Sequence, residues 1–84
     1  MSDEVTTIEK RIFREAYEFF ARHCCPPANQ EENAVDWWTD TAADVSAVDS
    51  KWTEYPLMRG FLLAIYEYLE FKAKEKTKEI DDFV

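Results

Sequence analysis

The stretch PLMRGFLLAIYEYLE, residues 56–70, decides the fold. Its apolar residues recur at the three- and four-residue spacing of a helix face. That face comprises Met58, Phe61, Leu62, Ile65, Tyr68 and Leu69. Leu63 points to the opposite side, so the first three turns are apolar nearly all round, which is typical of a helix that is central in its bundle or covered by a partner. Pro56 suits the first turn, and the pattern predicts a helix over residues 56–78 whose lysine-rich end, residues 72–78, is exposed and frayed.

A second helix is predicted over residues 6–24. Thr6 and Glu9 have the spacing of a capping box, in which hydroxyl and carboxylate satisfy each other's backbone donors. Pro26 and Pro27 end this helix, because proline lacks a backbone donor. Its expected core stripe comprises Val5, Ile8, Ile12, Ala16, Phe19 and His23.

A third helix is predicted over residues 31–52. Its expected core stripe comprises Val35, Trp38, Ala42, Val45 and Trp52, with Asp36 and Asp40 on the opposite, solvated face. Asp49 falls inside this stripe, where an unpaired carboxylate is costly. Either the helix loosens there and Asp49 reaches solvent, or Asp49 pairs with an Arg or Lys of another helix.

Together these segments predict an all-α fold, a compact three-helix bundle forming one domain over residues 1–84 with frayed termini. Hydrophobic residues make up 46% and aromatic residues 15% of the chain. This is a packing composition rather than that of a disordered chain. A chain of 84 residues buries only about 60 to 65% of its unfolded surface, so there is room for one core.

The chain is acidic, with a formal charge of −8. Residues 25–55 carry one basic and seven acidic side chains and account for −6 of that charge. Direct nucleic-acid binding is not expected, because such affinity comes from Lys and Arg. The longest apolar run, residues 61–66, is too short to span a membrane, and residues 1–4 do not begin a signal peptide, so we expect a cytoplasmic protein.

The chemically reactive residues cluster only at His23, Cys24 and Cys25. Three adjacent ligands do not match the spacing of a structural zinc site, and we expect no metal and no cofactor. We interpret the cysteines as thiols in a buried helix-end cluster, with a redox or metal role left open. With one histidine and no recognisable nucleophile setting, we expect no enzyme activity.

The leading functional hypothesis is a non-catalytic protein–protein interaction module. Trp37 and Val48 lie on the flank of their helix, and with Leu63 they are candidates for an apolar edge that binds an unknown protein or a second copy. For Trp37, wrapping around the core is the plainer alternative. The segment 80–84, in an alternating acidic and apolar end, is either a disordered terminus or a docking peptide.

The alternative hypothesis is an acidic decoy or inhibitor of a basic nucleic-acid-binding protein. In this reading exposed carboxylates stand in for phosphates. The candidate carboxylates are those of Glu31, Glu32, Asp36, Asp40 and Asp44.

The stretch from Trp37 and Trp38 to Trp52, followed by Tyr55, Pro56 and Leu57 and then by residues 61–70, resembles short uncharacterised all-helical proteins encoded by gut bacteria, some in mobile elements. The similarity covers about residues 13 to 70. It implies a bacterial origin and assigns no functional residue.

Overall fold

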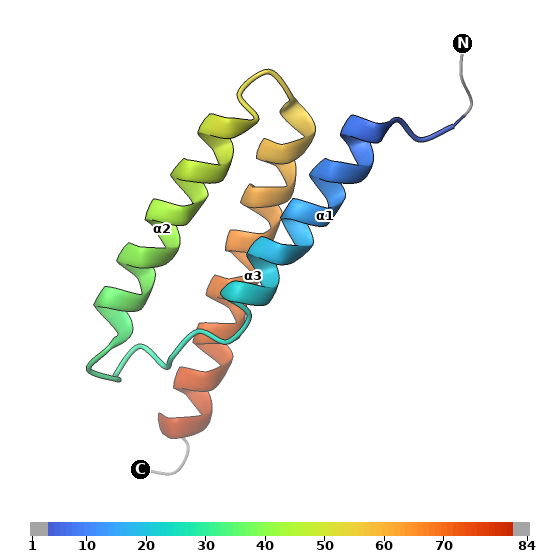
Figure 1. Ribbon diagram of the computed structural model, residues 1–84. Coiled ribbons are helices and arrows are strands. Elements are labelled where there is room, and N and C mark those ends of the chain that lie inside the picture. The colour runs from blue at the N-terminus through green and yellow to red at the C-terminus, as the bar shows by residue number, and fades with distance from the viewer. Residues whose placement is uncertain (1–3, 82–84) are drawn as a thin grey trace.

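The computed structural model describes residues 4–81, which form the three helices α1 (Thr7–Arg22), α2 (Ala34–Lys51) and α3 (Pro56–Asp81). The predicted all-α three-helix bundle is confirmed. Figure 1 shows α2 and α3 as neighbours joined by a short loop, with α1 crossing α3 on its other side. The backbone of α3 packs against both other helices, as its nearly all-round apolar sequence predicts. None of the described helices combines the length and apolar character needed to cross a bilayer.

The predicted capping box starts α1. The Thr6 hydroxyl accepts a hydrogen bond from the Glu9 N–H at 3.1 Å, and the Glu9 carboxylate accepts one from the Thr6 N–H at 2.9 Å. At the other end, His23 is the C-cap residue, three positions before Pro26. The helix is therefore fixed at both ends by the residues that the sequence indicates.

The core lies where the middle of α1 meets α3 and the end of α2. It consists of Ile12, Ala16, Phe19, Trp52, Met58 and Leu62, and Leu69 and Ala73 are also buried further along α3. The predicted stripe of α1 is wrong at its first turn, because Val5 and Ile8 are exposed. Val5 precedes the first residue of α1, and Ile8 lines a shallow pocket with Pro56 and Leu57 at the start of α3 that leaves it partly open to solvent.

The predicted core face of α2 is wrong in its direction. The buried face is rotated around the helix axis by about half of the 100° that separates successive residues. Val35 is 76% exposed and Ala42 is also exposed, whereas Ala34 and Thr41 are buried. The rotation places both Trp37 and Trp38 at the edges of the buried face, where each ring is half-covered. Thr41 is tolerated at the centre because its hydroxyl donates to the Trp37 carbonyl at 2.8 Å.

The loop between α1 and α2 packs against the end of α3. Pro26, Pro27 and Ala28 are buried, and the Asn29 N–H donates to the Thr77 hydroxyl at 2.8 Å. The predicted fraying over residues 72–78 is wrong, since α3 continues to Asp81 and Ala73 is buried, but the predicted exposure holds for Lys74, Glu75, Lys76 and Lys78. The predicted start of α2 at residue 31 is also wrong, because residues 29–33 form turns before Ala34. The predicted fraying at residues 1–3 and 82–84 lies outside the described residues.

Candidate functional site: the groove between α2 and α3

A groove of about 380 Å³ runs along the contact between α2 and α3. Its walls are mostly apolar. They are formed by Ala42, Val45, Ser46, Asp49, Arg59, Leu62, Leu63 and Tyr66. Leu63 is 60% exposed, so a large apolar side chain stands in the wall of this groove in contact with water. We call this surface the α2–α3 groove.

An ion pair between α2 and α3 forms part of the groove lining. Arg59 donates from Nε to Asp49 Oδ1 and from Nη2 to Asp49 Oδ2, both at 3.2 Å. Of the two interpretations of Asp49, the salt bridge to another helix is thus confirmed. Arg59 is 62% exposed, so the pair contributes little to stability, but its parallel geometry orients a charged group beside an apolar surface.

The three residues proposed for one apolar edge have different surroundings. Trp37 is half-buried, with its ring 6.1 Å from that of His23 and 4.7 Å from that of Trp38. Val48 is half-buried against the core. Of the three, only Leu63 lines the α2–α3 groove.

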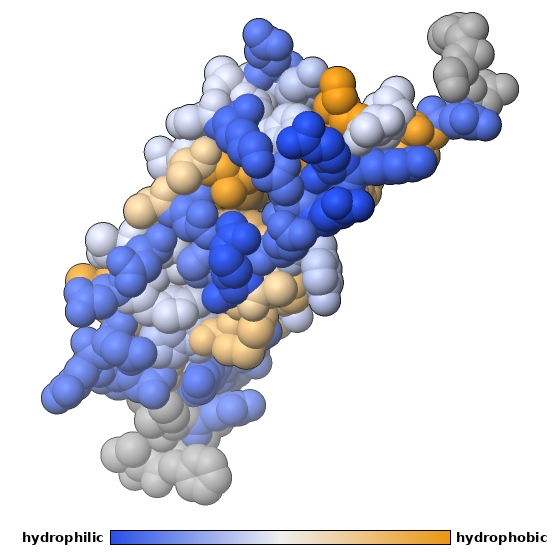
Figure 2. Space-filling view, in the orientation of Figure 1, coloured by the Kyte–Doolittle hydropathy of each residue, from blue (hydrophilic) through white to orange (hydrophobic). Residues whose placement is uncertain are grey.

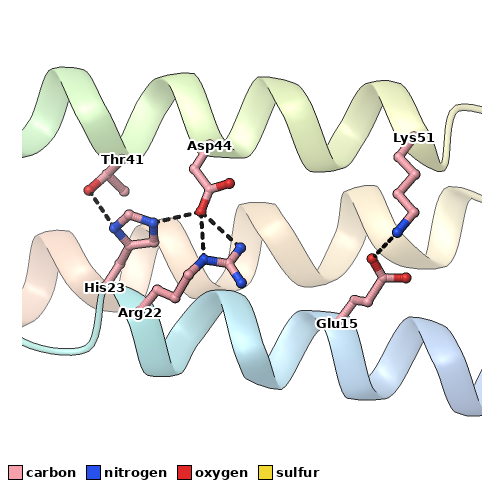
Figure 3. A network of polar contacts seen from close by, with 6 residues as sticks. All are labelled: Glu15, Arg22, His23, Thr41, Asp44 and Lys51. Atoms are coloured by element: carbon pink, nitrogen blue, oxygen red, sulfur yellow. Dashed lines mark hydrogen bonds and ion pairs between the residues drawn. The ribbon is translucent and has the colours of Figure 1, made fainter.

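A polar network joins the end of α1 to α2 (Figure 3). The Asp44 carboxylate lies 2.7 Å from Nε2 of His23 and 2.9 Å from Nη2 of Arg22, and the Thr41 hydroxyl lies 3.1 Å from Nδ1 of His23. The Thr41 hydroxyl also donates to the Trp37 carbonyl, and both ring nitrogens of His23 lie within hydrogen-bond distance of oxygen atoms of α2. Thr41 is 0% exposed, and through His23 and Asp44 the network connects the end of α1 to α2.

This network predicts a specific sensitivity to acid. Partial burial raises the pKa of the Asp44 carboxyl, but hydrogen bonds from His23 and Arg22 outweigh that effect and hold the pKa below its ordinary value of 3.8. A lowered pKa in the folded state stabilises the fold above the unfolded-state pKa, and this contribution is lost as the pH falls through the folded-state value. Between about pH 4 and pH 2 the wild type should lose more stability than Asp44→Asn.

Thermal unfolding followed by circular dichroism across that pH range measures this difference. Asp36→Asn is the matched control, because Asp36 is exposed and has no ion pair among residues 4–81. Equal acid sensitivity of the wild type and Asp44→Asn would show that the network does not hold the Asp44 carboxylate in its charged form.

The acidic residues proposed as phosphate mimics fall into two groups, one exposed and one paired with basic side chains. Glu32, Asp36 and Asp40 are exposed, and Glu31 is exposed while its carboxylate accepts a hydrogen bond from the Ala28 N–H. Asp44 is paired with Arg22 and His23. A basic partner at α2 would therefore meet Asp36 and Asp40, and it would have to compete with the bundle for Asp44.

The His23, Cys24 and Cys25 cluster does not form a three-ligand site. Both nitrogens of His23 are engaged by α2, and across residues 4–81 no three side chains of His, Cys, Asp or Glu converge on one point. Cys24 and Cys25 are free thiols with their sulfurs 2.8 Å apart, and the hydrogen bond to Cys25 raises the pKa of Cys24. Cys25 is exposed, so the expected buried cluster is wrong for that residue.

Sequence reasoning missed a second apolar surface, on α1 and α3. Phe13, Tyr17 and Phe71 lie beside the core stripes predicted for their helices, yet each is more than half exposed. The number of apolar residues in the sequence indicates such a surface. Apolar residues flank the core stripe of both helices, and a bundle of three helices is too small to bury all of them. By contrast, Figure 2 shows a side of the molecule on which hydrophilic side chains predominate and apolar side chains form small separate patches.

Comparisons with protein-family models, with curated proteins and with solved structures found no match for this chain. The candidate site therefore stands on its own geometry.

Proposed function

We propose that this chain is a non-catalytic protein–protein interaction module whose α2–α3 groove receives apolar side chains of a partner. The observation that supports the proposal is the position of Leu63, 60% exposed in the wall of a mostly apolar groove of about 380 Å³. A solvent-exposed leucine contributes nothing to the core, whereas burial of its remaining surface by a partner is favourable by roughly 25 cal/mol per Å².

The shape of the groove suits a helix. Since α2 and α3 are adjacent and joined by a short loop, they run antiparallel (Figure 1). The residues that line the groove extend from Ala42 to Asp49 on α2 and from Arg59 to Tyr66 on α3, about two turns of each helix. An amphipathic helix lying there would place side chains at positions i, i+3 and i+7 against Val45, Leu62 and Leu63. The Asp49–Arg59 pair would then offer a polar contact beside the apolar ones.

The test compares two substitutions that add the same charge to two exposed apolar positions. Leu63→Lys changes the groove wall, and Val35→Lys changes a residue that is 76% exposed on α2 and does not line the groove. Proteins captured from the source cell by the immobilised wild type are quantified by mass spectrometry. We expect the amount of captured protein to fall at least tenfold for Leu63→Lys and to stay unchanged for Val35→Lys. The loss of about 1.4 kcal/mol of apolar contact lowers affinity tenfold. Equal retention by both variants would contradict a role for the groove.

An acidic decoy is the alternative, and the exposure of Asp36 and Asp40 on one face of α2 favours it. A decoy would lose its partner on Asp36→Asn with Asp40→Asn and would be insensitive to Leu63→Lys. Its binding would also weaken steeply with salt, because exposed charges are screened within about 10 Å at 0.1 M ionic strength.

A further inference from the structure

Six aromatic side chains lie on α1 and α3, and we call the surface that they form the aromatic face. It comprises Phe13, Tyr17 and Phe20 of α1 and Phe61, Tyr68 and Phe71 of α3. The rings meet across the two helices, with centroids 4.7 Å apart for Phe13 and Phe61 and 6.1 Å apart for Phe20 and Tyr68. On α3, Tyr68 and Phe71 stack with their centroids 6.4 Å apart.

The aromatic face is open to solvent. Phe13 is 56%, Tyr17 70%, Tyr68 50% and Phe71 58% exposed. An aromatic side chain has about 200 Å² to bury, so these four residues alone expose about 450 Å² on each chain. That equals the largest apolar patch of an ordinary monomer, on a chain with a total accessible surface of only 6313 Å².

We propose that the aromatic face is covered by the same face of a second copy, forming a two-fold symmetric dimer. In such an interface one patch meets itself, so it must be both apolar and free of strong net charge. Residues 1–24, which include α1, carry four basic and five acidic side chains. Residues 56–84, which include α3, carry five basic and six acidic ones, so each segment has a net charge of only −1.

The charge on the rest of the chain favours a second copy over other partners for the aromatic face. Residues 25–55 carry −6, and a basic partner would be drawn to them rather than to the aromatic face. An anionic membrane surface would repel a chain of net charge −8. A second copy on α1 and α3 leaves both acidic α2 helices at the outside of the dimer, where they are solvated.

The available area approaches that of a stable interface once rim residues are added to the rings. The four most exposed rings contribute about 900 Å² of buried surface when both copies are counted, before any rim residue is included, and stable interfaces begin at about 1,200 Å² in total. Lys72 provides such a rim, since its Nζ lies 5.7 Å from the Phe20 ring and 5.6 Å from the Tyr68 ring.

The dimer surface is independent of the proposed function. At 100° per residue, Tyr68 lies about 140° from Leu63 and about 160° from Tyr66 around α3, and neither Tyr68 nor Phe71 lines the α2–α3 groove. A dimer would therefore present two open grooves, and either surface can be disabled without the other.

The test is the solution mass of the chain by sedimentation over a dilution series, at low and at high salt. We expect twice the chain mass of 10.0 kDa, with a dimer that persists at high salt because its contacts are apolar. Tyr17→Lys combined with Phe71→Lys should give a monomer, whereas the control Val35→Lys should remain a dimer. A monomeric wild type, or a double variant that still dimerises, would overturn the proposal; if the wild type is monomeric yet binds vesicles of zwitterionic lipid, the aromatic face is a membrane surface instead.

A second measurement needs no substitution and so does not depend on the folding of a variant. In a mixture of isotope-labelled and unlabelled wild type, isotope-filtered NMR detects contacts between chains. We expect these contacts at Tyr17, Tyr68 and Phe71. Contacts confined to Leu63 and the α2–α3 groove would instead show that the groove is the dimer interface, which would contradict this assignment.

Discussion

Replacing Phe19 by alanine should remove a large fraction of the stability of this protein. Phe19 is 0% exposed and belongs to the central core cluster, with its ring 4.9 Å from that of His23. Truncation of a fully buried phenylalanine costs about 3–5 kcal/mol. A domain of 84 residues has a free energy of unfolding of about 4–12 kcal/mol, so this loss is a large fraction of the total.

Urea unfolding followed by circular dichroism measures this change. Phe19→Leu, which keeps most of the side-chain volume, should lose less stability than Phe19→Ala. A loss below 1 kcal/mol for Phe19→Ala would contradict the packing of α1 against the core.

The second large effect contrasts two leucines on the same helix. Leu69 is 0% exposed and Leu63 is 60% exposed, although they are only six residues apart on α3. Leu69→Ala should cost about 2–5 kcal/mol, as for other buried leucines, whereas Leu63→Ala should change the free energy of unfolding by no more than about 0.5 kcal/mol.

The same urea titration measures both variants, and the identical substitution makes helix propensity cancel between them. Equal losses for the two variants would mean that Leu63 is part of the core and unavailable to a partner. A small loss of unfolding free energy for Leu63→Ala supports the proposed function, because the stability of the fold then does not explain the leucine at that position.

The helices could be predicted from the sequence because their signals are local. The capping box of Thr6 and Glu9, the prolines after α1 and Pro56 at the start of α3 each act within one turn. Periodicity also identified the buried face of α3, where Met58, Leu62 and Leu69 are buried as expected. Local interactions and a strong apolar stripe point to the same structure in these helices.

The orientation of α2 could not be predicted, because its apolar residues do not define one direction. Trp37 and Trp38 lie 100° apart, and a stripe centred on either one leaves the other out. The fold resolves this conflict by burying Thr41 between them, which is acceptable only because that hydroxyl reaches the Trp37 carbonyl. Hydropathy alone assigns threonine to the surface, so Val35 and Ala42 were placed in the core instead.

The candidate site was predictable only in part. Leu63 was identified because it points away from its own core stripe, and the structure places it in a groove. Trp37 and Val48 were expected beside it, but they face other neighbours, since the rotation of α2 turns them toward the interior. The aromatic face was missed because Phe13, Tyr17 and Phe20 lie directly beside the core stripe of α1. Sequence periodicity does not reveal which of the residues beside a stripe the neighbouring helix covers.

The central claim is that this protein makes its contacts through apolar surfaces rather than through its acidic residues. The most direct test is the salt concentration at which captured proteins leave the immobilised wild-type chain. The proposed function predicts that they remain bound when salt is raised from 0.1 M to about 1 M, where the screening length falls to about 3 Å. Release of the captured proteins within that range would contradict the claim and would identify the acidic face of α2, with Asp36 and Asp40, as the binding surface.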